Sequence, residues 1–126
     1  MIQPEIRDVL AAPNFAHLAT VLPDGAPHSV PVWIDVHDDQ IAILTGPESR
    51  KARNLKQDPR VAISLTPAGN PFQPVIIRGR VTEWMTGDAA WTIIDRIAEK
   101  YIGGPYSREE ERVVLLIDPE RQQFGM

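Results

Sequence analysis

The sequence contains no cysteine. This absence excludes disulfide bonds, thiolate zinc sites and cysteine nucleophiles. No hydrophobic run approaches the ~20 residues of a transmembrane helix, and the N-terminal stretch lacks the basic and apolar regions of a secretory signal. We therefore expect a cytoplasmic protein without a membrane segment. The sequence also lacks a Gly-rich phosphate loop, a dinucleotide fingerprint, a Ser-His-Asp pattern and any metal-ligand spacing around its three histidines.

Positive charge is scarce overall but concentrated in one segment. The chain has 126 residues and a formal net charge of -4, which argues against nucleic-acid binding over the whole surface. Five of the 13 Lys and Arg residues nevertheless fall between positions 49 and 60, where Asp58 is the only acid. This local excess predicts a small anionic partner.

Length and hydrophobic pattern predict a single domain, residues 1–126, that is mainly β with flanking helices. The expected strands are 15–22, 27–36, 40–45, 59–66, 75–84 and 112–119, and the expected helices are 3–13, 47–58 and 87–102. Two prolines predict an edge or a bulge in the second strand, near Pro31, because proline donates no hydrogen bond to a ladder. Gly79 indicates a bend or a close approach. The continuous apolar run at 112–119 is typical of a central, buried strand.

The segment TGPESRKARNL, residues 45–55, is the first candidate site. A helix N-terminus carries unsatisfied N–H groups and a partial positive charge, so it can bind an anion. Ser49 adds a hydroxyl donor, Arg50 a two-pronged fork and Lys51 a point charge. The pattern favours phosphate binding, although an exposed, solvated helix face would have the same composition.

The segment PHSVPVW, residues 27–33, is the second candidate. Apolar residues and a tryptophan in a proline-interrupted strand can form the wall of a pocket for a flat ring, while the alternative is an ordinary packed strand. No side-chain motif for catalysis stands out, so we assign no catalytic residue and no metal ligand. A bound cofactor that carries the chemistry fits this sequence better.

Taken in order, these segments resemble a known family. The stretches FAHLATVLPDGAPHSVPVWIDV, IAILTGPESRKARNLKQDPRVAISL and IRGRVTEW are similar to the flavin-binding split β-barrel proteins, which include the pyridoxamine 5'-phosphate oxidase family and its deazaflavin-dependent relatives. The resemblance extends from about residue 5 to residue 120. It implies a six-stranded antiparallel split barrel that forms a homodimer with two cofactor sites at the interface.

The resemblance also assigns residues to the cofactor. In its terms, residues 49–51 would hold the phosphate, and residues 30–33 would run beside the ring and the ribityl chain. Residues 53 and 54 would support the phosphate or a longer tail, and the loop at residue 72 would bring an aromatic ring from the second subunit. The assigned residues are Val30, Pro31, Val32, Trp33, Thr45, Ser49, Arg50, Lys51, Arg53, Asn54 and Phe72.

The short chain lacks the longer C-terminal segment of true pyridoxamine 5'-phosphate oxidases and looks closer to the compact deazaflavin-dependent branch. We therefore expect an F-420-dependent reductase that transfers hydride to an unsaturated small molecule, with the proton coming from solvent. An FMN-binding oxidoreductase of the same fold and a non-catalytic flavin- or deazaflavin-binding protein remain alternatives. An oligonucleotide-binding barrel is a third, which the net charge opposes.

Overall fold

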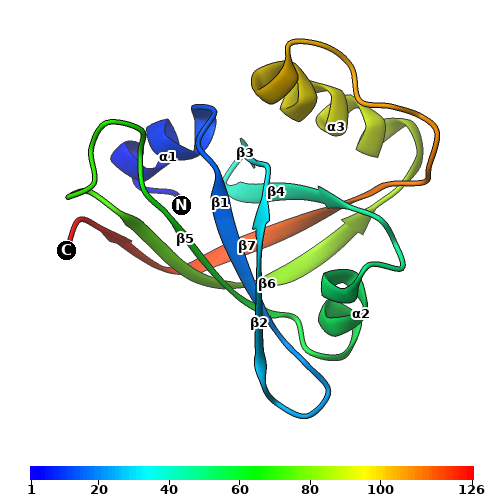
Figure 1. Ribbon diagram of the computed structural model, residues 1–126, viewed down its shortest axis with the longest axis horizontal. Coiled ribbons are helices and arrows are strands. Elements are labelled where there is room, and N and C mark those ends of the chain that lie inside the picture. The colour runs from blue at the N-terminus through cyan, green and yellow to red at the C-terminus, as the bar shows by residue number, and fades with distance from the viewer.

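The protein is built on one antiparallel sheet that curls around its core (Figure 1). The computed structural model describes residues 1–126. Seven strands follow one another in the order β2-β1-β5-β6-β7-β4-β3. The strands are β1 (Ala16–Val21), β2 (Pro27–Val32), β3 (Ile34–His37), β4 (Gln40–Thr45), β5 (Arg60–Leu65), β6 (Val75–Met85) and β7 (Val113–Phe124), and the helices are α1 (Pro4–Ala11), α2 (Arg50–Gln57) and α3 (Gly87–Ile102).

The expected mainly β barrel is confirmed, but the expected count of six strands is wrong. The segment predicted as one strand over 27–36 forms two, because the chain changes partners at Trp33. Before this residue β2 pairs with β1, and after it β3 pairs with β4. β2 and β3 are the two edges of the sheet, and one residue joins them, so the edges meet and the sheet curls. Pro31 lies on an edge strand, as its missing N–H predicted.

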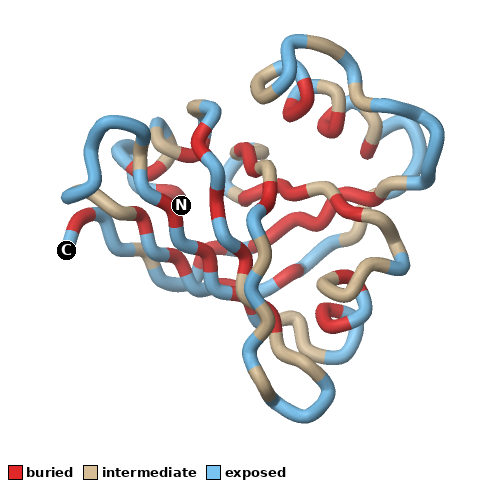
Figure 2. Tube along the Cα trace, in the orientation of Figure 1, coloured by how far each residue is buried: buried red, intermediate tan, exposed pale blue.

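The main core fills the inside of the curled sheet. β5 and β6 alternate buried and exposed residues, which places one face of each strand inside (Figure 2). Helix α1 contributes Ile6 and Leu10 to this core and lies against β3. The strands thus bury one apolar face against each other and against α1.

A second apolar cluster fixes α3 on the outside of the sheet. Ile94 and Ile97 of α3 pack with Ala42 of β4 and with Val114 and Leu116 of β7. The first half of β7 is therefore buried on both faces, between β6 and β4, and the prediction of a central strand is confirmed.

The helices agree with the predictions except at the start of α2. α3 covers residues 87–102 as expected and ends at Gly103, which has a left-handed φ of 72°. α2 begins at Arg50 rather than at Pro47, because the Ser49 hydroxyl caps it by accepting a hydrogen bond from the N–H of Ala52. None of the three helices has the length and apolar character that spanning a bilayer requires.

Gly79 lies where β6 and β7 come close together. A Cβ atom there would lie 2.1 Å from the carbonyl oxygen of Asp118. The pairing register of the two strands shifts between Arg78 and Gly79, which marks a β-bulge. The predicted close approach is confirmed, and only glycine fits it.

Candidate functional site

A cavity of about 440 Å³ opens between the end of β2, strand β4, helix α2 and the loop after α3. Its size lies within the range of small-molecule sites. Most of the residues that line it are apolar, and the one lysine among them could bind an anionic group. The lining residues are Phe15, Pro31, Val32, Trp33, Leu44, Lys51 and Tyr106. The fold therefore brings the two sequence candidates, 27–33 and 45–55, to one site.

Trp33 forms a fixed aromatic wall of the cavity. Its ring stacks on Tyr101 of α3 at a centroid distance of 5.1 Å and meets Tyr106 edge-on at 6.1 Å. The Tyr101 hydroxyl donates to the backbone carbonyl of Asn14 and accepts from the N–H of Ile34. Burial raises the pKa of Tyr101, so this phenol keeps its proton and these bonds. The contacts that hold this wall are therefore all made within the chain itself.

Thr45 and Ser49 connect β4 to α2 through their hydroxyl groups. The two Oγ atoms lie 2.8 Å apart, and the Ser49 Oγ also accepts from the Ala52 N–H at 3.2 Å. Thr45 is buried and Ser49 is half-buried. Their first task is thus to shape the turn and cap the helix, and a ligand contact by Ser49 stays a prediction.

Arg50 is held by a chain of polar side chains. Its Nε donates to Asn54 Oδ1 at 3.0 Å, and Asn54 Nδ2 donates to the Thr20 hydroxyl on β1 at 3.0 Å. Asn54 is fully buried, so it can position Arg50 but cannot touch a ligand. The rest of the Arg50 guanidinium makes no hydrogen bond and is free for an anion.

Lys51 lines the cavity, and Arg112 places a second positive charge near it. Burial, and then the positive charge of Arg112, lower the pKa of Lys51. Arg112 comes directly before β7, whose Val113 pairs with Thr45, so the sheet places it beside the turn at Gly46. Arg112 already forms an ion pair with Glu110 at 3.3 Å, so Lys51, which has no carboxylate partner, is the cation that favours an anionic ligand. Sequence reasoning missed Arg112, since only the β4–β7 pairing reveals it.

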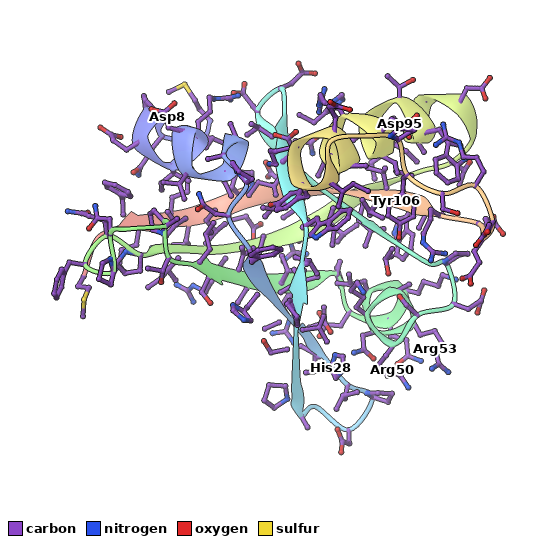
Figure 3. The ribbon with its side chains drawn as sticks, turned by 45° about the horizontal axis from the view of Figure 1, so that its top comes forward. Asp8, His28, Arg50, Arg53, Asp95 and Tyr106 are labelled. Atoms are coloured by element: carbon purple, nitrogen blue, oxygen red, sulfur yellow. The ribbon has the colours of Figure 1, made fainter.

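Tyr106 is held in place by its own loop. The Arg108 guanidinium makes two 2.6 Å bonds to the Asp95 carboxylate and lies 4.0 Å above the Trp91 ring. The same carboxylate accepts from the Tyr106 N–H. The bond from Arg108 lowers the pKa of Asp95. Tyr106 packs with the α3 cluster (Figure 3) and accepts a long hydrogen bond from Arg112.

Three assigned residues lie away from the cavity. Val30 of β2 packs against the main core. Arg53 is exposed on α2 and projects outward in Figure 3. Phe72 is 75% exposed in the loop that follows β5, whereas α2 precedes β5, so this loop and α2 lie at opposite ends of the strand (Figure 1). Phe72 is not among the residues that line the cavity of its own chain.

This arrangement can bind and orient, but it carries little chemistry of its own. Lys51 and Tyr106 are the titratable side chains in the lining. No group of three His, Asp or Glu side chains is arranged to hold a metal ion. A flat apolar wall beside two cations fits a planar ring that carries an anionic group.

Comparisons with known proteins connect this fold to a family of oxidoreductases. The sequence pattern described as pyridoxamine 5'-phosphate oxidase matches residues 2–124. A search of curated proteins found no match.

Among solved structures, an F-420 reductase is 26% identical with a TM-score of 0.84, over 97% of this chain and 98% of that one. The conserved hypothetical protein Rv2991 from Mycobacterium tuberculosis is 30% identical with a TM-score of 0.83, over 99% and 84%. A putative pyridoxamine 5'-phosphate oxidase from Listeria innocua is 20% identical with a TM-score of 0.75, over 95% and 94%, and this similarity concerns the fold alone.

Proposed function

The chain belongs to the pyridoxamine 5'-phosphate oxidase family, and on this basis we propose that it is an F-420-dependent reductase. The cavity would take the deazaflavin ring, and the start of α2 would take the phosphate. The 26% identical F-420 reductase, which this chain matches over nearly its full length, supports this cofactor over FMN.

One observation carries the proposal: the apolar cavity and the cationic turn are neighbours. Lys51 belongs to both, since it lines the cavity and lies in the first turn of α2. Lys51 makes no ion pair and no side-chain hydrogen bond, and burial followed by the charge of Arg112 lowers its pKa. An anion from the ligand would supply the missing partner. The residues present therefore fit a ring with a phosphate attached.

Each part of the site would have one task. Trp33 and Leu44 would contact the ring and exclude water from one side. Lys51, Arg50 and Arg112 would bind the phosphate, with Asn54 positioning Arg50. When bound and reduced, F-420 supplies a hydride from its C5 carbon to an unsaturated substrate. The protein would contribute proximity and orientation, and solvent would supply the proton.

Two alternatives use the same cavity. The family contains flavin-binding oxidoreductases, so FMN is the second candidate cofactor. A non-catalytic protein that stores or senses the cofactor would need the same phosphate and ring contacts. A cytoplasmic location remains our expectation for each.

We also propose that a second copy completes the site. Phe72 does not line the cavity of its own chain, and its ring is exposed on the loop between β5 and β6. In a symmetric homodimer, this loop would cover the cavity of the partner. The binding site would then consist of Lys51 from one copy and Phe72 from the other.

Turnover separates the three functions. Purified protein is mixed with reduced F-420, or with reduced FMN, and a panel of unsaturated carbonyl compounds, and cofactor oxidation is followed under anaerobic conditions. Substrate-dependent oxidation of reduced F-420 is the expected result. Oxidation of FMN alone would favour the flavin enzyme, and tight binding without turnover of any compound would favour the non-catalytic protein.

A further inference from the structure

The outer face of β5, β6 and the second half of β7 is covered by no helix. The buried side chains of helix α3 pack with β4 and the first half of β7, and Met85 at the end of β6 joins the same cluster. The exposed side chains of this open face include an unusual number of arginines, which are Arg60, Arg78, Arg80 and Arg121. The rest of the chain is acidic on balance, so the cluster needs an explanation.

The β-bulge at Gly79 places two of these arginines opposite each other. From Gly79 to Val81 the pairing runs Gly79–Pro119, Arg80–Asp118 and Val81–Ile117. If this register continued without the bulge, Arg78 would lie opposite Glu120. The bulge shifts β7 by one residue, and Arg78 pairs with Arg121 instead.

This exchange replaces an opposite-charge pair with a like-charge pair. Directly opposed like charges on neighbouring strands destabilise a sheet. Bulges often occur beside functional sites, where they redirect side chains. The pairing therefore costs stability in the free protein, and an anion bound between the two side chains would offset that cost.

The neighbouring arginines are neutralised, but this pair is not. Arg60 binds Asp58 at 2.7 Å, which lowers the pKa of Asp58 to about 2, and Arg80 binds Glu120 at 3.2 Å. Arg78 and Arg121 make no ion pair and no side-chain hydrogen bond.

The pair also has room for a ligand. Two surface depressions of about 500 and 280 Å³ both include Arg78 and Arg121 in their lining. Gln122 and Gln123 also line the smaller one, and their amide groups already donate to the carbonyls of Met1 and Gly125, so the two arginines are the donors without a partner there. On the other side of Arg78, its partner on β5 is Ala62, a small side chain that leaves the guanidinium accessible.

We propose that Arg78 and Arg121 form an oxyanion-binding site on the open face, separate from the site at α2. Two guanidinium forks on adjacent strands can grip one phosphate-type group from both sides. A ligand with two such groups could occupy both depressions. The site takes a phosphorylated small molecule, for which inorganic phosphate and pyrophosphate are simple probes.

Calorimetric titration of the full chain with pyrophosphate tests the proposal. We compare the wild type with Arg78→Gln, Arg121→Gln and, as a matched control, Lys51→Gln at the α2 site. Each arginine variant should weaken pyrophosphate binding about tenfold or more, because it removes charge-assisted bonds. Pyrophosphate can also occupy the phosphate site at α2, so the titration is fitted with two sites. Lys51→Gln should weaken only the binding at α2 and leave the binding at Arg78 and Arg121 in place. Without ligand, both arginine variants should melt at a higher temperature than the wild type, since the like-charge pair is gone.

Three outcomes would overturn the proposal. One is the absence of saturable pyrophosphate binding, and another is equal binding by all four proteins. The third is loss of binding only in Lys51→Gln, which would place the anion at α2. A citrate titration and an acidic peptide titration identify the source of the anion. Tighter binding of either than of pyrophosphate would also contradict a phosphate site. Failure here leaves the cofactor proposal untouched, because the two sites share no residue.

Discussion

Ser49 combines two tasks that a pair of substitutions can separate. Its hydroxyl caps α2, and the proposed function gives it a place beside a phosphate. Ser49→Ala should lower the free energy of unfolding by about 1 kcal/mol through loss of the cap. Ser49→Asp keeps an acceptor for the Ala52 N–H and suits the positive helix end, so stability should be retained.

The same two variants test the phosphate. A carboxylate at position 49 should repel it, so Ser49→Asp should bind the cofactor at least about tenfold more weakly than Ser49→Ala does. Urea unfolding gives the stabilities, and fluorescence titration gives the affinities. If Ser49→Asp bound the cofactor as tightly as the wild type, the anion would lie elsewhere.

Lys51 should make cofactor affinity depend on pH. Its pKa is lowered in the free protein by burial and by Arg112, and a bound phosphate would favour the charged form. Affinity should therefore be highest below this lowered pKa and fall as pH rises through it. Titration from about pH 8 upward avoids the second phosphate ionisation, near pH 6.

Arg112→Gln provides the matched comparison. Removing the neighbouring charge should raise the pKa of Lys51, so the loss of affinity should shift to higher pH. Affinity at pH 8 should nevertheless be lower than in the wild type, because one cation is missing. An unchanged pH profile in this variant would show that the two side chains do not share a ligand.

At the residue scale, sequence could find only what is local. Ser49, Arg50 and Lys51 stand together in one segment, and their charge was visible there. By contrast, Asn54 is buried by packing against a distant part of the chain. Arg112 reaches the site through the pairing of β4 with β7, and Tyr106 reaches it because Asp95 holds its loop. The sequence on either side of these residues contains no signal that would assign them to the site.

At the scale of elements, Gly79 controls the junction of β6 and β7. A methyl group at this position would collide with the backbone of Asp118. Gly79→Ala should destabilise the protein by about 2–3 kcal/mol, since the backbone cannot yield as a flexible side chain would.

Gly104→Ala is the control for this substitution. Nothing lies within 4 Å of a Cβ built at Gly104, and its φ is not in the left-handed region. We expect a change within about 0.5 kcal/mol for Gly104→Ala. Equal effects of the two substitutions in thermal or urea unfolding would mean that the close approach at Gly79 is not a constraint.

Most elements could be predicted from the sequence, because the spacing of the apolar residues agrees with the positions of the proline and glycine residues that end the elements. Alternation marked β5 and β6, and helical spacing marked α3 over its full length. The division between β2 and β3 could not be read, because the run through Trp33 stays extended while its partner strand changes. The start of α2 was misplaced because Pro47 competes with Ser49 as a helix-start signal, and the cap at Ser49 decides.

At the scale of the whole molecule, we predict a homodimer whose two sites each combine Lys51 of one copy with Phe72 of the other. Phe72→Ala and Lys51→Gln should each weaken cofactor binding. Coexpression of the two variants should restore a fraction of full-affinity sites, because a mixed dimer contains one intact pair. Sedimentation velocity should give twice the mass of the chain. A monomer that binds cofactor, or no restoration on mixing, would contradict the shared site.

The barrel itself was predictable from the order of the segments, whereas the dimer is not visible within one chain. Segment order carries the topology, because consecutive strands pair with few alternatives. A dimer interface depends on the complementary shapes of two surfaces, and these shapes cannot be predicted from composition or from the period of the apolar residues. Because the ring of Phe72 is exposed, the Phe72→Ala variant can test the predicted dimer site without disturbing the core.

The central claim is that the cavity beside α2 binds a deazaflavin through Lys51. Equilibrium fluorescence titration with F-420 and with FMN tests it most directly, using the wild type, Lys51→Gln and Lys56→Gln. Lys56 is an exposed cation on the same helix and serves as the control. We predict saturable binding with F-420 preferred, about tenfold or greater weakening in Lys51→Gln, and no change in Lys56→Gln. Binding of neither cofactor, or equal affinities in all three proteins, would contradict the account.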